Sequence, residues 1–312
     1  MPQKIMTNTL EKWINHYIKT EEPRSKSLII SVFGDAISPY SEGIWLSELI
    51  QLMSVFGINE RLVRTSAFRL SDEGWLTSRK EGRRSFYSLT PAGTRRFESA
   101  YKHIYQSYHI DWDGQWTLVV LQKNLEATTE RTELRKELEW NGFTLLSNGV
   151  FLHPLASLDT ARQIVERNGY QELALIFRAS SIEDSDGFSN MPKIRASWNL
   201  DEVNQRYQKF VADFKPALAL LNSNDLSALS AFQLQTLMIH SFRRANLHDP
   251  QLPNQLLPAD WPHADAFNLC KTIYNITCQR AHAFIAELTH IDTQSNSGNR
   301  LNIAVKDRFN QP

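Results

Sequence analysis

Four structural signals follow one another in the segment 59–93, which reads NERLVRTSAFRLSDEGWLTSRKEGRRSFYSLTPAG. The first is a capped basic helix. Asn59 is a good amino-terminal cap, because its side chain can accept a hydrogen bond from an unpaired backbone N–H. Apolar residues at helical spacing then predict a helix over 60–73, with an inward stripe of Val63, Ala67 and Leu70. The second signal is Gly74, which suits the left-handed position at a helix end.

A basic hairpin and a second capped helix complete the pattern. Residues 75–77 predict a strand, 79–85 a basic loop with a glycine turn, and 86–89 the returning strand. Thr90 suits the cap of the next helix, and Pro91 suits its first position, where no backbone N–H is needed. The hairpin therefore has a cationic tip.

Two helices are expected before this segment. Residues 27–33 form an apolar segment suited to a first helix, and 45–56 a second, which ends at the tight turn Gly57-Ile58. A helix, a tight turn and an arginine-rich helix predict a helix-turn-helix, whose second helix enters the major groove of DNA. With the hairpin as a wing, the sequence predicts a winged helix-turn-helix.

The local charge supports DNA binding. From Arg24 to Lys102 there are twelve Lys and Arg residues against eight Asp and Glu, and seven of these cations lie on the third helix and the wing. Such placement matters because phosphate contacts come from side chains on one surface, and arginine suits bidentate contact with guanine. We expect DNA contacts from Asn59, Arg61, Arg64, Thr65, Arg69, Arg79, Lys80, Arg83 and Arg84.

The alternative is a small α+β packing unit with a solvated basic face. Arg69 suits a structural salt bridge as well as a phosphate contact. We expect Phe68 to be a partly buried packing residue rather than a contact for a thymine methyl group. The four signals in this order favour DNA binding over the alternative.

Composition limits the class of protein. The chain has 312 residues, with 34 Lys and Arg against 34 Asp and Glu and a formal net charge of +0, so nucleic-acid binding must come from a local patch. Its first residues lack a secretory signal, and no apolar run reaches the ~18–20 residues of a membrane span. Two cysteines, Cys270 and Cys278, make no disulfide framework. We expect a cytoplasmic protein.

The middle of the chain has its own pattern. The predicted elements are strands over 116–121, 144–146, 149–152 and 173–177, and helices over 129–140 and 157–168. Their order, β-α-β-β-α-β, is the ferredoxin-like arrangement. The stretch 183–192 is the best candidate linker, because it is rich in Ser, Asp, Gly and Pro.

These patterns predict an α+β multidomain protein. Its parts are an amino-terminal helical extension (1–26), a winged-helix DNA-binding domain (27–108), a ferredoxin-like middle domain (109–182) and a mostly helical carboxy-terminal domain (183–312). The roles expected of the last two, dimerisation for 109–182 and effector binding or dimerisation for 183–312, come from a family resemblance and not from these patterns.

Further motifs lie outside the winged helix. They are FGDA at 33–36, WDGQW at 112–116, HSFRR at 240–244, DPQLP at 249–253 and LLPADWP at 256–262. Together with the segment 59–90, they resemble the PaaX family of repressors of phenylacetic acid degradation operons. The resemblance covers nearly the whole chain. It departs at His263, where a glycine is expected after the Trp-Pro pair.

The resemblance implies a homodimeric repressor of phenylacetate catabolic genes on a palindromic operator. It implies release by phenylacetyl-coenzyme A rather than by free phenylacetate, with no catalytic residues and no cofactor. A coenzyme A thioester needs cations for its phosphates and an apolar slot for its ring. Such side chains occur at His240, Arg243, Arg244 and Trp261. Alternatively, Arg243 or Arg244 pairs with Asp249 or Asp260 and only holds a helix against the proline-rich loop.

Other functions remain open. An enzyme acting on acyl thioesters would need a catalytic constellation, but the sequence has no G-x-S-x-G, G-x-x-x-x-G-K-[S/T] or G-x-G-x-x-G motif. A nucleic-acid-binding protein without an effector is a second alternative.

A redox sensor is the third alternative. Cys270 and Cys278 lie eight residues apart on a helical stretch, about 12 Å of rise, which exceeds the reach of a disulfide. No metal site is expected, because His240, His248 and His263 with these cysteines have no compact zinc spacing.

Overall fold

A computed structural model of the chain describes residues 9–106, 111–122, 129–167, 169–180, 191–221, 226–291 and 308–309. The chain divides into two compact units that do not follow sequence order. Unit 1 consists of Met1–Ser107, Gln205–His248 and Pro262–Pro312, and unit 2 of Tyr108–Asn204 and Asp249–Trp261. Most of the carboxy-terminal helical region therefore shares a unit with the amino-terminal region.

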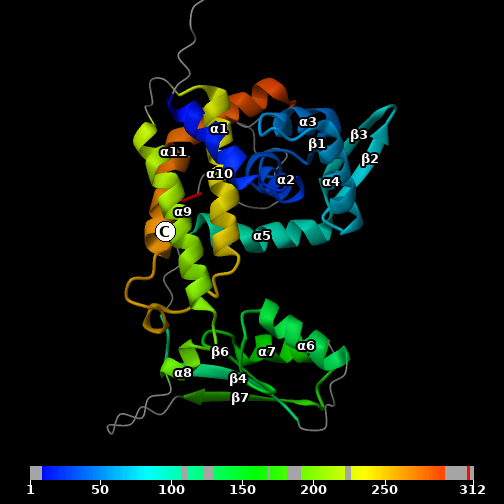
Figure 1. Ribbon diagram of the computed structural model, residues 1–312. Helices are drawn as coiled ribbons and strands as arrows, with labels where there is room; N and C mark the ends of the chain where they lie inside the picture. Colours follow the sequence, from blue (N-terminus) through cyan, green and yellow to red (C-terminus); the bar gives the residue numbers. More distant parts are fainter. Residues whose placement is uncertain are drawn as a thin grey trace, which may run out of the picture. The chain divides into compact units, whose positions relative to one another are not determined.

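The amino-terminal part of unit 1 is a winged helix, drawn in blue to cyan (Figure 1). Its elements are α2 (Ser25–Val32), the π-helical turn η1 (Phe33–Ile37), β1 (Gly43–Trp45), α3 (Leu46–Ser54), α4 (Glu60–Asp72), β2 (Leu76–Glu81) and β3 (Arg84–Leu89). The strands form an antiparallel sheet of order β1-β3-β2. The helices α1 (Thr9–Glu21) and α5 (Pro91–Tyr105) flank it in sequence. The predicted winged helix-turn-helix is confirmed.

Local contacts explain where α4 begins and ends. The side-chain Oδ1 of Asn59 accepts a hydrogen bond from the backbone N–H of Leu62 at 3.0 Å, which is the predicted cap. Gly74 has a φ of +71°, a left-handed conformation that glycine adopts without strain. Val63 and Leu70 are buried, so the opposite side of the helix faces solvent.

The wing is longer and tighter than expected. The segment 79–85 was expected to be a loop, but β2 continues to Glu81 and β3 begins at Arg84, so that only Gly82 and Arg83 form the turn. Gly82 has a φ of +60°, and a two-residue turn with glycine first and a positive φ only there is type II′, which suits the twist of a hairpin. The ladder extends this far because backbone pairing does not require apolar side chains.

Unit 2 contains the ferredoxin-like domain. Its elements are β4 (Gln115–Leu121), α6 (Thr129–Trp140), β5 (Thr144–Ser147), β6 (Val150–His153), α7 (Leu158–Arg167) and β7 (Ala174–Ser180). The strands form an antiparallel sheet of order β5-β6-β4-β7. The predicted β-α-β-β-α-β order is confirmed. Of the predicted linker over 183–192, only Met191 and Pro192 lie within the described residues.

Both faces of this sheet carry apolar side chains, because residues alternate along a strand. One face packs with α6 and α7 in a core that includes Val119 and Phe151. The other carries Trp116, which packs in a second core with Trp198 and parts of the segment 252–257. On β7, Leu175 and Phe177 lie in register with Val120 and Leu118 of the same face and are 45% and 48% exposed.

The last third of the chain is mostly helical, as predicted. Its elements are α8 (Met191–Arg195), α9 (Leu200–Leu220), α10 (Ala228–Asn246), the 3₁₀ turn η2 (Asn254–Leu256) and α11 (His263–Leu288). In unit 1, α10 packs against α11, α2 and α5, and it is buried over most of its length. The winged helix is thus attached to the carboxy-terminal helices through α10.

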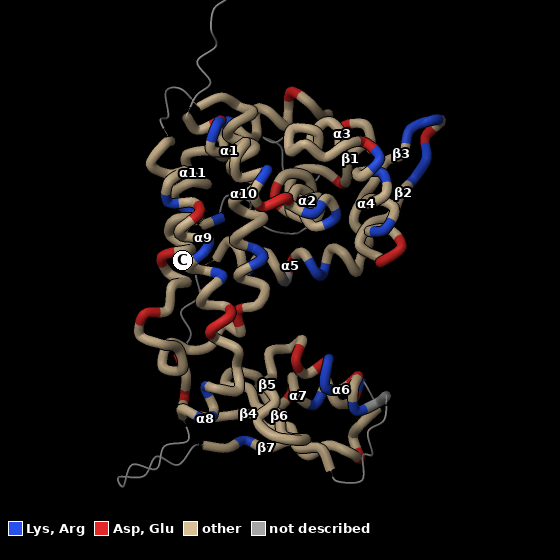
Figure 2. Tube along the Cα trace, viewed as in Figure 1, with Lys and Arg blue, Asp and Glu red and all other residues tan. Residues whose placement is uncertain are grey.

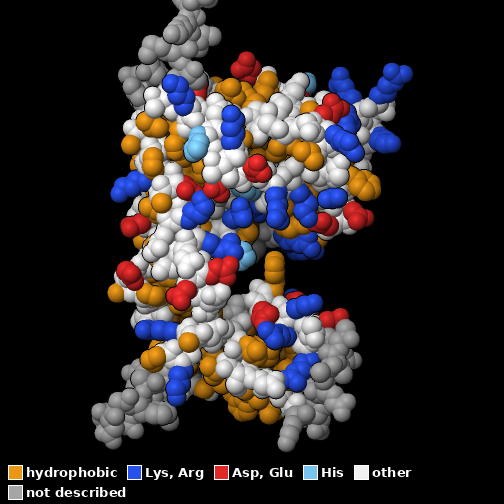
Figure 3. Space-filling view, in the orientation of Figure 1, with side chains coloured by type: hydrophobic (Ala, Val, Ile, Leu, Met, Phe, Trp, Pro, Cys, Tyr) orange, Lys and Arg blue, Asp and Glu red, His pale blue; other side chains and the backbone are white. Residues whose placement is uncertain are grey.

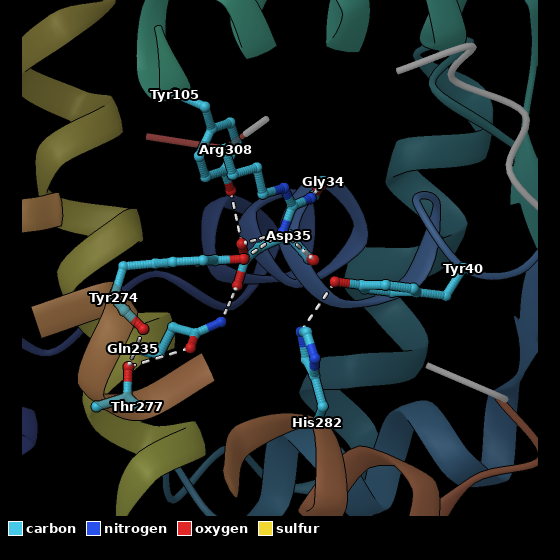
Figure 4. A network of polar contacts seen from close by, with 9 residues as sticks. All are labelled: Gly34, Asp35, Tyr40, Tyr105, Gln235, Tyr274, Thr277, His282 and Arg308. Atoms are coloured by element: carbon cyan, nitrogen blue, oxygen red, sulfur yellow. Dashed lines mark hydrogen bonds and ion pairs between the residues drawn. The ribbon is translucent and has the colours of Figure 1, made fainter. Parts of the chain in front are cut away.

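A buried polar network strengthens this attachment (Figure 4). Nη1 of Arg308 donates to Oδ1 of Asp35 at 2.9 Å and to the hydroxyl of Tyr274 at 2.6 Å. The Tyr105 hydroxyl donates to the same carboxylate oxygen at 2.6 Å, and Gln235 donates to Oδ2 at 2.8 Å. Buried charges are tolerated when they are paired and hydrogen-bonded. The network therefore ties η1 to α5, α10 and α11 within unit 1.

Candidate nucleic-acid interface

The outward face of α4 carries the residues predicted to contact DNA. Arg61, Thr65 and Phe68 lie along its centre, because residues four and seven apart share a helix face. Arg64 and Arg69 lie on either side, about 60–80° from the centre at roughly 100° per residue. All five side chains are exposed. Three guanidinium groups and a hydroxyl are therefore presented together.

The cations of α4 differ in their partners. Nη2 of Arg64 lies 2.6 Å from Oε1 of Glu60, one turn earlier. Within the part of the chain that the structure describes, Arg61 and Arg69 form no ion pair and no side-chain hydrogen bond. The Thr65 hydroxyl donates to the backbone oxygen of Arg61 at 2.9 Å. An exposed pair at this spacing contributes only about 0.3–0.5 kcal/mol, so a phosphate or a base can replace Glu60 as the partner of Arg64.

Two of the wing arginines lie against aromatic rings. The guanidinium carbon of Arg79 is 4.3 Å from the centroid of the Phe86 ring, and its Nε is 3.0 Å from Oε1 of Glu81. The guanidinium carbon of Arg84 is 5.9 Å from the ring centroid of Trp45. These contacts hold both cations against the base of the hairpin while the guanidinium edges stay exposed.

The other two wing cations extend into solvent. Arg83 occupies the turn, and Lys80, in register with Ser85, lies on the opposite side of the ribbon from Arg79. Among the described residues neither has an ion pair or a side-chain hydrogen bond. Figure 2 shows Lys and Arg along the hairpin, and Figure 3 shows their side chains projecting from it at the upper right. Such a projecting, cationic ribbon can contact phosphates beside a helix in the major groove.

Phe68 differs from the sequence-based expectation. It was expected to be partly buried, but it is 70% exposed at the centre of the α4 face. The inward stripe of Val63, Ala67 and Leu70 already fills the interior side of this helix, which leaves no room there for Phe68. Helical periodicity could have shown this, because Phe68 shares its face with Arg61 and Thr65.

Three of the four residues predicted to bind an effector lie on α10. Nδ1 of His240 is 3.0 Å from the hydroxyl oxygen of Ser31 on α2. Burial, with the positive charges of Arg243 and Arg244, lowers the pKa of His240 to about 3. Arg243 donates to the hydroxyls of Ser27 and Ser31 at 3.0 and 3.2 Å. His240 and Arg243 therefore join α10 to the first helix of the winged helix.

Arg243 and Arg244 have no acidic partner within the described part of unit 1. No carboxylate in the described part of unit 1 forms an ion pair with Arg243 or Arg244. Burial and the charge of Arg244 lower the pKa of Arg243 to about 10. A partly buried guanidinium without a counter-charge favours a bound anion. Trp261, the fourth predicted residue, belongs to unit 2.

Within the described ranges, no group of three or more His, Cys, Asp or Glu side chains could hold a metal ion. Burial raises the pKa of the Cys270 thiol well above its ordinary value and also raises that of Cys278, and a thiol is less reactive when it is less ionised. Among the described residues, no helix has the length and apolarity to span a membrane.

The amino-terminal, middle and carboxy-terminal regions of the chain all match models of one protein family. Residues 24–93 match the family model described as PaaX-like protein, 109–190 the PaaX protein central Cas2-like domain, and 198–287 the PaaX-like protein C-terminal domain. The chain is 35% identical over 280 residues to the transcriptional repressor PaaX of Escherichia coli (strain K12), covering 89% of this chain and 88% of that protein.

A solved structure supports the fold alone. The uncharacterized protein Rv0674 from Mycobacterium tuberculosis aligns with a TM-score of 0.52 at 22% identity, covering 84% of this chain and 98% of that one.

Proposed function

Because the chain belongs to the PaaX family, we propose that it is a transcriptional repressor that binds operator DNA through α4 and the wing. One observation supports this most directly: exposed arginine and lysine side chains without acidic partners, Arg61, Arg69, Lys80 and Arg83, project from these two elements within the described residues. An exposed cation without an acidic partner breaks no ion pair of the protein when it contacts a phosphate. Its contact also releases counterions from the DNA.

The proposed binding mode follows from the geometry of α4. Its outward face, from Arg61 to Phe68, lies in the major groove, where Arg61 and Arg64 reach base edges and Thr65 contacts a base or a phosphate. Lys80 and Arg83 contact phosphates beside the groove. Asn59 acts mainly by fixing the start of the helix, since its Oδ1 already accepts the Leu62 N–H.

We propose that the protein acts as a homodimer. A palindromic operator presents two half-sites about 34 Å apart, or a multiple of that, which requires two winged helices. The exposed side chains of Leu175 and Phe177 on the edge strand β7 form an apolar strip that a second copy could cover. The domain over 109–182 is therefore the proposed dimerisation domain.

The proposed effector is phenylacetyl-coenzyme A, and the proposed gene targets are those of phenylacetate catabolism. Arg243 and Arg244 have no acidic partner in the described part of unit 1 and suit the phosphates of such a thioester. An anion there would draw Arg243 away from Ser27 and Ser31 on α2. Effector binding would thereby break the hydrogen bonds between α10 and the first helix of the winged helix. The effector shifts the equilibrium only by its differential affinity for the two states, typically about 5–150-fold.

A gel shift on the DNA upstream of the protein's own operon tests the proposal. Phenylacetyl-coenzyme A should release the DNA, whereas phenylacetate should not. The double variant Arg61→Ala/Arg83→Ala should bind more weakly with a smaller salt dependence, and the control Arg162→Ala, an exposed arginine on α7, should bind like the wild type. Equal binding by the double variant would refute the interface, and catalytic release of coenzyme A would favour an enzyme.

A further inference from the structure

Phe68 is a large apolar side chain at the centre of a cationic surface. It is 70% exposed, one turn beyond Thr65 and seven residues beyond Arg61, with Arg64 and Arg69 on either side. No other side chain of the described residues covers its ring sufficiently to bury it. Single exposed apolar residues are common on proteins, so the exposure alone indicates nothing. Its position does, because the surrounding face is the one that the proposed function places in the major groove.

The major groove offers one apolar group to a side chain in this position. Guanine, cytosine and adenine present hydrogen-bond donors and acceptors there, and thymine adds its C5 methyl group. A phenyl ring cannot satisfy donors or acceptors, and placing it against them would leave them without partners. Contact with a methyl group instead removes apolar surface of both partners from water.

We propose that Phe68 contacts the methyl group of an operator thymine and so supplies a base preference that the arginines of α4 do not. This inference rests on the proposed function. From Arg61 to Phe68 the helix rises about 10.5 Å, which is roughly three base-pair steps of 3.4 Å. The thymine therefore lies about three base pairs from the pair that Arg61 contacts.

Uracil is the probe, because it differs from thymine only by the missing methyl group. Each thymine of one operator half-site is replaced in turn by uracil. The dissociation constants of the wild type and of Phe68→Ala are then measured on each duplex. One position should weaken wild-type binding about fourfold, the effect of one buried methyl group. At that position Phe68→Ala should bind the thymine and uracil duplexes equally.

Leu62 provides the matched control. It is also an apolar residue of α4 and is 50% exposed, but it lies about 100° around the helix from Arg61, beside the reading face. Leu62→Ala should keep the fourfold penalty for uracil. Phe68→Leu should keep part of it, since leucine retains an apolar contact.

Three results would overturn the inference. They are a uracil penalty that persists in Phe68→Ala, the absence of any sensitive thymine in the wild type, and a change in oligomeric state on Phe68→Ala with the penalty unchanged, which would place the ring in a protein interface. Failure of the wild type to bind the operator duplex without uracil would instead contradict the proposed function, and the inference with it.

Discussion

The network around Asp35 and the exposed face of α4 and the wing both depend on arginine, but in opposite surroundings. Arg308 is 1% exposed at its side chain, and it donates to a carboxylate, a tyrosine hydroxyl and backbone carbonyls. Arg61 and Arg83 are exposed and, among the described residues, have no acidic partner. A buried guanidinium needs hydrogen-bond acceptors and a counter-charge inside the protein. An exposed guanidinium is hydrated until an anion replaces the water. The first kind stabilises the fold, and the second remains free to bind.

Removing the buried carboxylate should have the largest effect on stability. Asp35→Ala leaves Arg308 charged and buried without its partner, and breaking one side of a buried ion pair costs about 3–5 kcal/mol of unfolding free energy. Urea denaturation of the variant against the wild type measures this loss. Asp72→Ala, at the exposed end of α4, is the control and should change stability by less than about 0.5 kcal/mol. A loss below about 1 kcal/mol for Asp35→Ala would show that the network does not hold unit 1 together.

A smaller change within the same network tests the hydrogen bonds separately from the charges. Tyr105→Phe removes only the hydroxyl that donates to Oδ1 of Asp35 at 2.6 Å. A hydrogen bond to a charged group contributes about 1.5–3 kcal/mol, so the free energy of unfolding should fall by that amount. Tyr87→Phe on β3 is the matched control, because no hydrogen bond of its hydroxyl is formed within the described residues. Equal stability of the two variants would mean that the Tyr105 hydroxyl adds nothing to the ion pair and the remaining hydrogen bonds of the network.

His240 is an intermediate case: it is buried, and no carboxylate of the described residues forms a hydrogen bond or an ion pair with it. Burial and the charges of Arg243 and Arg244 lower its pKa to about 3 from 6.5, so the native protein binds fewer protons here than the unfolded chain does below pH 6.5. Stability from this residue is therefore complete above pH 6.5 and is lost as the pH falls toward 3.

At pH 5 the loss should be about 2 kcal/mol relative to pH 7. His240→Gln removes the titrating group, so its free energy of unfolding should decline by about 2 kcal/mol less over the same range. His153, in unit 2, has a pKa lowered to about 4 by burial and titrates in both proteins. Parallel pH profiles of wild type and variant would contradict the assignment.

Local signals predicted most of the fold. The caps at Asn59 and Thr90 and the helix end at Gly74 depend only on neighbouring backbone groups, and the structure confirms each. The order of helices and strands along the ferredoxin-like domain also followed from local patterns. The extent of the wing did not, because the strands of β2 and β3 continue through charged residues that carry no apolar alternation.

The buried network could not have been predicted in this way. Asp35 and Arg308 are separated by 273 residues, and no periodicity connects positions so far apart. The motif at 33–36 indicated that Asp35 belongs to a shared pattern, but not what it contacts. The candidate interface was easier, since helical spacing alone places Arg61, Thr65 and Phe68 on one face. The error on Phe68 came from its residue type, which suggested burial, against its position on the helix.

Arg83 should show the smallest effect on stability, although its effect on DNA binding should be clear. The side chain lies in the wing turn, exposed and, among the described residues, unpaired, so Arg83→Ala should change the free energy of unfolding by no more than about 0.5 kcal/mol. Operator affinity should fall on all sequences alike, and the slope of log affinity against log salt should decrease by about one. The control Arg83→Lys keeps the charge and should keep the slope. Arg64→Ala should lower operator affinity and, if Arg64 contacts a base edge, should relax the preference for one base. An unchanged slope for Arg83→Ala would show that the wing turn does not contact DNA. The contrast with the buried network would then fail, because an exposed, unpaired arginine would not by itself mark a binding surface.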